Sequence, residues 1–142
     1  MAIASGDDGV DLVRKLGADQ AVNGRNPNVV GAVKVFAPNG LDAVLAFAYQ
    51  DGLKDALKQV KKTGRIAYPN GVDPEPVGLA GVEVSAYDGL PSPEVFDRLN
   101  SLIAQGPFHV EISRTYRLEE AAQAHQDVLK HHLGKLALRI AD

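Results

Sequence analysis

The chain has 142 residues, of which 45% are hydrophobic and 23% charged, with a formal net charge of −3 and no cysteine. This composition is typical of one compact globular domain or slightly more, and it excludes disordered and collagen-like chains. The lack of cysteine excludes a disulfide framework, a thiolate zinc site and a cysteine nucleophile. The acidic balance argues against a nucleic-acid partner, and no apolar run approaches the ~20 residues that span a membrane. With no secretory pattern at the N-terminus, we expect a cytoplasmic protein.

The first part of the chain alternates strand-like apolar runs with amphipathic helical stretches. Strands are predicted at residues 2–5, 21–23, 42–48, 65–68 and 82–87. The third helix is expected to carry Val60 on its buried stripe and to end at Gly64. The run at 42–48 is almost continuously apolar, which is typical of a parallel strand covered on both faces. This rhythm predicts an α/β fold with a parallel sheet, right-handed crossovers and ligands at the carboxyl ends of its strands.

The last part of the chain has a different rhythm. A helix is predicted to start at Ser92 and to stop at Gly106. The buried face of that helix is expected to be Val95, Phe96, Leu99, Leu102 and Ile103. A strand at 110–115, a helix at 118–130 and a strand at 135–140 follow. We therefore expect one domain over residues 1–106 and a separate strand-helix-strand segment over residues 107–142.

Several stretches of the chain carry a family resemblance. Residues 14–23 read RKLGADQAVN, 41–45 read LDAVL, 62–66 read KTGRI, 116–125 read YRLEEAAQAH and 134–140 read GKLALRI. In this order they resemble the nucleotide-binding portion of the medium-chain dehydrogenase/reductase superfamily. The lack of cysteine favours its zinc-free, quinone oxidoreductase-like branch. The resemblance implies a partial Rossmann-type (doubly wound), mostly parallel sheet. It also implies an NADP-dependent enzyme that passes hydride from nicotinamide to a carbonyl or an activated alkene.

The same resemblance identifies what the chain lacks. Members of that family are more than twice as long, and their nucleotide-binding domain opens with a strand and a glycine-rich turn. No G-x-G-x-x-G occurs here. In the strand order 3-2-1-4-5-6, the missing strand belongs between the strands at 2–5 and 42–48, which would each expose unpaired backbone groups. Either these two strands pair directly or another polypeptide supplies the strand, and we favour closure or self-association.

At the ribose end of the cofactor, the resemblance places Ser5 and Gly6 where NAD-dependent enzymes carry an acidic residue. A small, neutral pair leaves room for the 2′-phosphate of NADP. Asp7 and Asp8 would repel that phosphate, so NAD stays an alternative. Arg25 is the candidate partner for the phosphate, and the competing interpretation is that it is an ordinary surface loop residue.

At the nicotinamide end, the family uses backbone groups just beyond three later strands. The matching positions are Phe47, Ala48, Pro69, Asn70, Ser85 and Tyr87. Their side chains need not be polar, because main-chain amides and carbonyls make the contacts. The alternative is that they are ordinary strand ends and turns, but ligands in parallel α/β sheets bind at such positions.

No side chain stands out as a catalytic acid, base or metal ligand. His125 falls on the apolar face of the last helix, which predicts a packed, hydrogen-bonded residue in place of a base. His131 and His132 are adjacent and point in different directions on a helix, so they do not form a metal pair. We assign no catalytic residue and expect no metal site.

Two functions remain open at this stage. In the first, the chain is the cofactor-binding portion of an NAD(P)H-dependent quinone or enone oxidoreductase, a homodimer whose substrate is a small carbonyl compound or quinone. The isolated chain would then bind cofactor weakly and turn over little, because it lacks the turn that holds the pyrophosphate. In the second, the chain is a non-catalytic oligomerising module that associates through its outer strand at 82–87.

Overall fold

The computed structural model describes residues 1–49, 51–77 and 80–140. By its internal contacts the chain divides into two compact units, Met1–Val95 (unit 1) and Phe96–Asp142 (unit 2). The division falls inside a helix, eleven residues before the boundary expected at residue 106. These contacts show that each unit is compact, not that it folds on its own. The domains expected at residues 1–106 and 107–142 therefore stay a prediction.

Unit 1 alternates strands and helices along the chain, as predicted. Its elements are β1 (Ala2–Ala4), α1 (Gly6–Lys15), β2 (Ala21–Asn23), α2 (Val29–Phe36), β3 (Leu41–Leu45), α3 (Asp51–Leu57), β4 (Val60–Pro69) and β5 (Glu83–Tyr87). α4 (Pro93–Gln105) contains the boundary between the units. Unit 2 continues with β6 (Ile112–Arg117), the 3₁₀ turn η1 (Leu118–Glu120), α5 (Ala121–Asp127) and β7 (Lys135–Arg139).

All the strand pairings among the described residues are parallel. β1 pairs with β2, β3 pairs with β4, β4 pairs with β5, and β6 pairs with β7. In unit 2, α5 connects the two parallel strands, which is the predicted strand-helix-strand segment. The α/β class and the partial Rossmann-type sheet are therefore confirmed.

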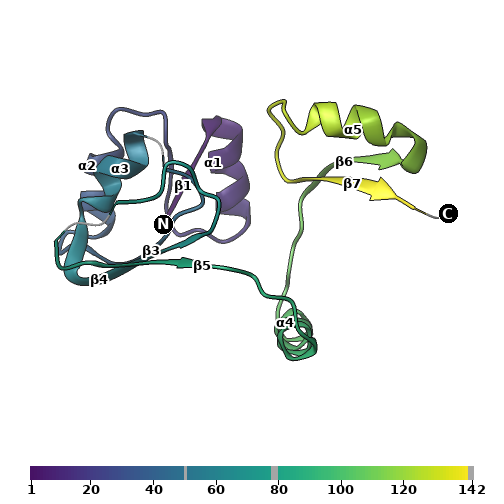
Figure 1. Ribbon diagram of the computed structural model, residues 1–142. Helices are drawn as coiled ribbons and strands as arrows, with labels where there is room; N and C mark the ends of the chain where they lie inside the picture. The colour runs from purple at the N-terminus through teal and green to yellow at the C-terminus, as the bar shows by residue number, and fades with distance from the viewer. Residues whose placement is uncertain (50, 78–79, 141–142) are drawn as a thin grey trace. The chain divides into compact units, whose positions relative to one another are not determined.

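The expectation that the strands at 2–5 and 42–48 pair directly is wrong. β1 and β3 belong to separate sheets, with strand orders β1-β2 and β3-β4-β5. The packing of α2 against α3, which lie side by side in Figure 1, explains why. Both helices contribute to one core that also contacts strands of both sheets, so bringing β1 onto β3 would require these helices to repack.

Two buried clusters hold unit 1 together. The first joins α3 to the three-stranded sheet and consists of Ala46, Leu57, Val60, Ile66 and Tyr68. The second lies on α2 and α3, and consists of Val29, Val33 and Ala56. Met1, Ile3, Val22, Leu41 and Leu53 are partly buried against the second cluster. Apolar stripes at helical spacing on α2 and α3 thus face strands at period two, which fixes the layers of the unit.

Two expectations about helices are wrong. α3 ends at Leu57 and not at Gly64, and Val60 is buried as the first residue of β4. A β-branched residue serves a strand as well as a helix, so the apolar spacing did not separate the two. The apolar face expected to be buried on α4 is exposed, with Val95 and Phe96 52% and 54% accessible. Within the described residues, no other element of unit 2 packs extensively on that helix.

No helix in the described part of the chain is long and apolar enough to cross a membrane.

Candidate functional site

The turn after β1 brings the first two predicted residues to the start of α1. Ser5 is the extended residue that precedes the helix, with φ −88° and ψ 122°. Gly6 follows with φ +78°, a left-handed conformation that favours glycine over any residue with a Cβ atom. The Gly6 amide donates a hydrogen bond to Asn23 Oδ1 at 3.3 Å. The β1–α1 turn is therefore tied to the end of β2.

Asn23 connects two turns that are distant in sequence. Its Oδ1 also accepts a hydrogen bond from the Arg25 amide at 3.0 Å, and its Nδ2 donates to Asp7 Oδ1 at 2.9 Å. Ser5, Gly6 and Arg25 consequently lie at one corner of unit 1. Sequence analysis did not assign Asn23 a role, although a strand-terminal asparagine is a known partner for nearby backbone groups.

The charges at this corner are mixed. Asp7 and Asp8 lie in the first turn of α1, where carboxylates interact favourably with the helix dipole. Asp8 Oδ1 accepts a hydrogen bond from the Gly9 amide at 2.9 Å. Arg25, whose amide is bonded to Asn23, is exposed at the same corner. The corner thus combines the side chain of Arg25 with the N-terminus of α1, whose first turn already contains the negative charges of Asp7 and Asp8.

A mostly apolar cavity of about 640 Å³ opens from this corner. Its lining includes Ser5, Gly24 and Arg25 beyond β1 and β2, and Phe47 and Ala48 beyond β3. The amino ends of the same strands also contribute to the lining, so the cavity runs along the gap between β1 and β3. We call it the inter-sheet cavity. Its volume lies within the range of about 300–1,000 Å³ found for small-molecule sites.

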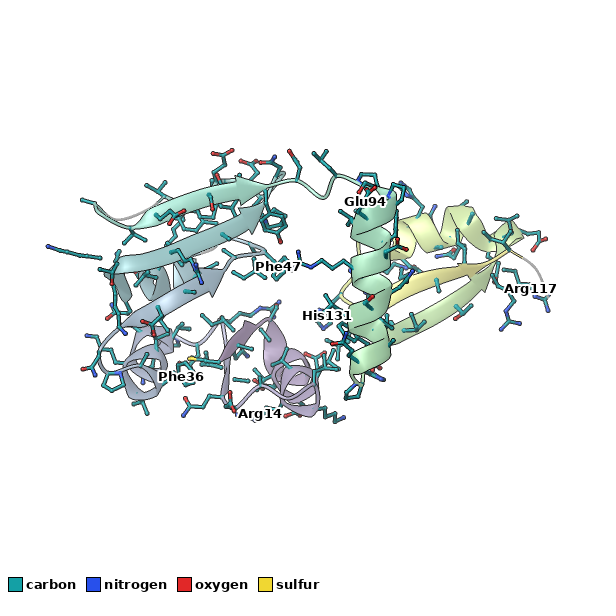
Figure 2. All side chains as sticks on the ribbon, turned by 90° about the horizontal axis from the view of Figure 1, so that it is seen from below. Arg14, Phe36, Phe47, Glu94, Arg117 and His131 are labelled. Carbon is teal, nitrogen blue, oxygen red and sulfur yellow. The ribbon has the colours of Figure 1, made fainter. Side chains whose placement is uncertain are left out.

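A second cavity of about 420 Å³ lies at the carboxyl ends of β3 and β4. It is lined by Phe47, Ala48, Tyr49, Pro69, Asn70, Gly71, Val72 and Asp73. Phe47 and Ala48 line both cavities, and Figure 2 shows Phe47 just beyond the tip of β3. The two cavities therefore share these two residues in their lining.

Ser85 and Tyr87, the last of the positions predicted at the nicotinamide end, lie on the neighbouring strand β5. Pro69 is opposite Tyr87 in the β4–β5 register, and the Asn70 amide donates to the Tyr87 carbonyl at 3.0 Å. Ser85 is opposite Ala67, two residues back from this edge. The structure thus brings Tyr87 to the edge where the second cavity opens, whereas Ser85 is set back within β5.

Unit 2 contains a polar cluster that sequence analysis missed. Tyr116 is buried, and its hydroxyl donates to Asp127 Oδ2 at 2.8 Å. Asp127 Oδ1 accepts from Lys130 Nζ at 2.6 Å and from Gln123 Nε2 at 3.0 Å. The hydrogen bond from Lys130, followed by that from Tyr116, lowers the pKa of Asp127 to about 2. The cluster joins β6 to α5.

The expectation for His125 is wrong. Its side chain is exposed, and Ala124 takes the buried position on α5. The helix is two turns long and covers only a narrow strip of β6 and β7, so one small residue fills the contact.

Comparisons with known proteins agree with this geometry. Residues 16–138 match the family model of the zinc-binding dehydrogenases. In an alignment 148 positions long, the chain is 25% identical to quinone oxidoreductase of Mus musculus. The match covers 95% of this chain and 44% of the mouse protein. The chain therefore spans less than half the length of this curated relative and matches its carboxyl-terminal portion.

Solved structures show the same fold. An NAD-dependent alcohol dehydrogenase superposes with a TM-score of 0.81 at 20% identity, covering 98% of this chain and 43% of that one. A mycobacterial protein complexed with NADPH superposes with a TM-score of 0.68 at 22% identity, covering 97% of this chain and 48% of that one. At these identities the likeness establishes the fold alone.

The residues present do not fit the zinc ion that the family's name implies. Protein zinc is held by three or four Cys, His, Asp or Glu side chains. The sequence has no cysteine, and within residues 1–49, 51–77 and 80–140 no group of three or more such side chains is close enough to hold a metal. We therefore derive no chemistry through zinc.

The family match covers most of the chain, and the parallel α/β architecture agrees with it. The chain belongs to the zinc-binding dehydrogenase family, within the medium-chain dehydrogenase/reductase superfamily.

Proposed function

We propose that unit 1 holds the ribose and nicotinamide ends of NADP in a quinone or enone oxidoreductase that does not depend on zinc. The observation that carries this proposal is that Phe47 and Ala48 line both cavities. One cavity is also lined by Ser5 and Arg25, and the other by Asn70. A dinucleotide is elongated and would lie along the carboxyl edge of the strands, where these residues are found.

In this proposal the residues orient the cofactor and perform no proton transfer. Backbone groups at Phe47, Ala48, Pro69 and Asn70 would hold the nicotinamide ring, with Tyr87 behind Asn70. When bound, the nicotinamide supplies hydride chemistry toward a small carbonyl compound or quinone.

The choice of NADP over NAD rests on the corner around Asn23. Ser5 and Gly6 present no acidic side chain at the ribose position, and Arg25 is available for a 2′-phosphate. Asp7 opposes this preference, but its carboxylate accepts a hydrogen bond from Asn23 Nδ2. We therefore expect NADPH to bind more tightly than NADH.

The test is a saturation-transfer NMR titration of the whole chain with NADPH and NADH, a method suited to the weak binding expected of a sequence with no G-x-G-x-x-G turn. Arg25→Ala should weaken NADPH binding about tenfold or more, as expected from losing a charged hydrogen bond of about 1.5–3 kcal/mol, and leave NADH binding within about twofold. Arg98→Ala, in exposed α4, is the matched control and should change neither. Equal losses for both cofactors would contradict the phosphate role of Arg25.

A second candidate function is association through β5. This strand is the last in the order β3-β4-β5, so one of its edges has no strand neighbour among the described residues. An open edge pairs readily with its own copy about a twofold axis. A homodimer formed in this way is compatible with cofactor binding, because it would use the outer edge of β5, whereas the Tyr87 carbonyl faces β4 and accepts from the Asn70 amide.

A further inference from the structure

Asparagine is followed by glycine at three places in unit 1. The three pairs are Asn23-Gly24, Asn39-Gly40 and Asn70-Gly71. Asparagine is a thermolabile residue, because the backbone nitrogen of the next residue can attack its side-chain carbonyl carbon and expel ammonia. Glycine favours this attack, since it has no Cβ atom to obstruct the nitrogen and leaves the backbone free to turn. The attack also needs a mobile asparagine side chain and a backbone amide that is not held as a hydrogen-bond donor, and the three pairs differ in both respects.

In the first pair, both reacting groups are held. The Gly24 amide donates to the Ala4 carbonyl at 2.8 Å. The Asn23 side chain accepts hydrogen bonds from two backbone amides and donates one to Asp7. A hydrogen bond stabilises the protonated form of the donor and so opposes its attack as a nucleophile. Asn23 therefore reacts only after the end of β2 opens.

In the second pair, one reacting group is held and the other is free. Asn39 is exposed. The Gly40 amide, however, donates to the Ala37 carbonyl at 2.9 Å. Gly40 also lies against the backbone of the segment before β4, since a Cβ atom on it would be 2.9 Å from the Gln59 carbonyl oxygen. The nitrogen is thus both occupied and hindered from moving toward the Asn39 side chain.

In the third pair, neither reacting group is held. Asn70 and Gly71 are the central residues of a turn that is closed by a hydrogen bond from the Val72 amide to the Pro69 carbonyl at 3.4 Å. This bond makes no use of the Gly71 amide. Within the part of the chain that the structure describes, neither that amide nor the Asn70 side chain has a hydrogen-bond partner. Both residues are exposed, and a Cβ atom on Gly71 would meet nothing within 4 Å.

We infer that Asn70 is a site of spontaneous deamidation in the folded chain. The Gly71 nitrogen forms a bond to Asn70 Cγ, the Cγ–Nδ2 bond breaks, and ammonia leaves with the proton of the Gly71 amide. Water then opens the resulting cyclic imide. Addition of water at Cγ gives aspartate, and addition at the backbone carbonyl carbon gives isoaspartate. Either product carries a carboxylate at neutral pH in place of the neutral side-chain amide.

The new charge would lie at the second cavity, whose lining includes Asn70 and Asp73. A second carboxylate beside Asp73 makes this cavity less favourable for a ligand that carries phosphate groups. The isoaspartate product also adds an atom to the backbone of the turn. This consequence rests on the proposed function: if the nicotinamide end of the cofactor binds here, deamidation should weaken NADPH and NADH binding by similar factors.

The test is incubation of the whole folded chain at mildly alkaline pH, followed by trypsin digestion and mass spectrometry. Trypsin separates the three pairs into the peptides 16–25, 35–54 and 66–98. A sample without incubation corrects for deamidation during digestion. We expect Asn70 to react about fivefold faster than Asn39 and about tenfold or more faster than Asn23, because one or several hydrogen bonds must open first at those two sites.

Asn39 is the matched internal control, because it and Asn70 both stand in the sequence Pro-Asn-Gly. In concentrated urea, where the folded structure is lost, the two sites should react at rates within about twofold of each other. Asn70→Gln should leave the peptide 66–98 unchanged, since the longer side chain would have to close a larger ring. Asn39→Gln should leave the rate at Asn70 as it is in the parent chain.

Two results would overturn the inference. The first is a rate at Asn70 in the folded chain that is equal to or lower than the rate at Asn39. The second is the same ratio of these rates in urea as in the folded chain, which would mean that local sequence and not structure sets them.

A separate experiment tests the consequence for cofactor binding. Asn70→Asp reproduces the aspartate product, and its titration with NADPH and NADH should show a similar loss for both. If Asn70 reacts fastest but Asn70→Asp binds both cofactors like the parent chain, the cofactor contacts proposed at the second cavity are wrong and the deamidation site stands.

Discussion

At the scale of single residues, two polar side chains join elements that are far apart in the sequence. Asn23 connects the turn after β1 to the turn after β2 through the amides of Gly6 and Arg25. Asp127 connects α5 to β6 through the hydroxyl of Tyr116. In both cases one side chain satisfies several donors, which makes its removal more costly than the loss of a solvent-exposed ion pair.

The stabilisation by Asp127 depends on pH. Its pKa in the folded chain is about 2, below the ordinary value of 3.8, because Lys130 and Tyr116 donate hydrogen bonds to the carboxylate. A carboxyl group with a lowered folded-state pKa stabilises the fold fully above its unfolded pKa and loses this contribution as pH falls toward 2. Asp127→Asn should therefore unfold at lower urea than the parent chain at pH 7.

Urea denaturation followed by tyrosine fluorescence at pH 7 and pH 2 measures this difference. The two midpoints should move closer together at the lower pH, where about half of the parent carboxyl is protonated in the folded chain and most of its stabilising contribution is lost. Asp97→Asn, in exposed α4, is the control and should keep the parent midpoint at both values. A difference between Asp127→Asn and the parent chain that is as large at pH 2 as at pH 7 would show that the charge of Asp127 does not contribute.

At the scale of elements, unit 1 depends on helices that pack closely onto parallel strands. The start of α3 passes so near the end of β2 that only a glycine fits, since a Cβ atom on Gly52 would meet the Gly24 carbonyl oxygen. On the opposite side of the layer, β4 buries Ile66 in the cluster shared with α3. These contacts, more than helix propensity, determine where the short helices lie.

Gly52→Ala should destabilise the chain although alanine is the better helix former. The gain in helix propensity is about 1 kcal/mol, whereas forcing an extra methyl group against backbone costs about 1–3 kcal/mol. Thermal unfolding by circular dichroism measures the balance. Gly89→Ala has open space around it and should leave the melting temperature unchanged. A more stable Gly52→Ala chain would mean that the segments after β2 and β3 separate easily.

Ile66→Ala should lower the free energy of unfolding by about 2–5 kcal/mol, because it leaves a cavity in the cluster between β4 and α3. Ile66→Val removes one methylene group and should cost only about 0.5–1.5 kcal/mol. Chemical denaturation of the two variants gives both values. Equal, small effects would indicate that this cluster is loosely packed in solution.

At the scale of the whole molecule, the outer edge of β5 decides how the chain associates. It presents backbone groups that another strand can pair with. The Tyr87 carbonyl accepts from Asn70, so the backbone groups of Tyr87 face β4 and those of Ala86 face outward. A dimer formed through β5 would therefore use the amide of Ala86.

Light scattering of the chain should give twice the monomer mass of 15.1 kDa if β5 pairs with its own copy. Ala86→Pro removes the outward amide without removing an amide that faces β4, so it should return the mass to that of a monomer. A proline elsewhere, such as Ala104→Pro, would not serve as a control because it would break α4. The control is Ala86→Val, which keeps the amide at this position and should stay dimeric. A monomer at all concentrations would contradict association through β5.

The order of elements in unit 1 could be predicted because each one has its own local pattern. The continuous apolar run at β3 and the glycine and proline punctuation around it identify a parallel strand without reference to any other part of the chain. The choice of Phe47, Pro69 and Tyr87 as cofactor contacts came from the family resemblance and not from that order alone. Val60 shows the limit, because a lone β-branched residue between helix and strand carries no local signal for either.

The amino-acid sequence by itself determined the α/β class and the parallel strand-helix rhythm, but not where the strands end, since the strand expected at 42–48 is Leu41–Leu45. Only the tertiary structure decided that β1 and β3 stay apart, that Asn23 and Asp127 each hold several partners, and that the apolar face of α4 is exposed. The physical reason is the range of the interactions. Periodicity and turn residues act over a few positions, whereas strand neighbours, polar clusters and buried faces depend on contacts between segments distant along the chain.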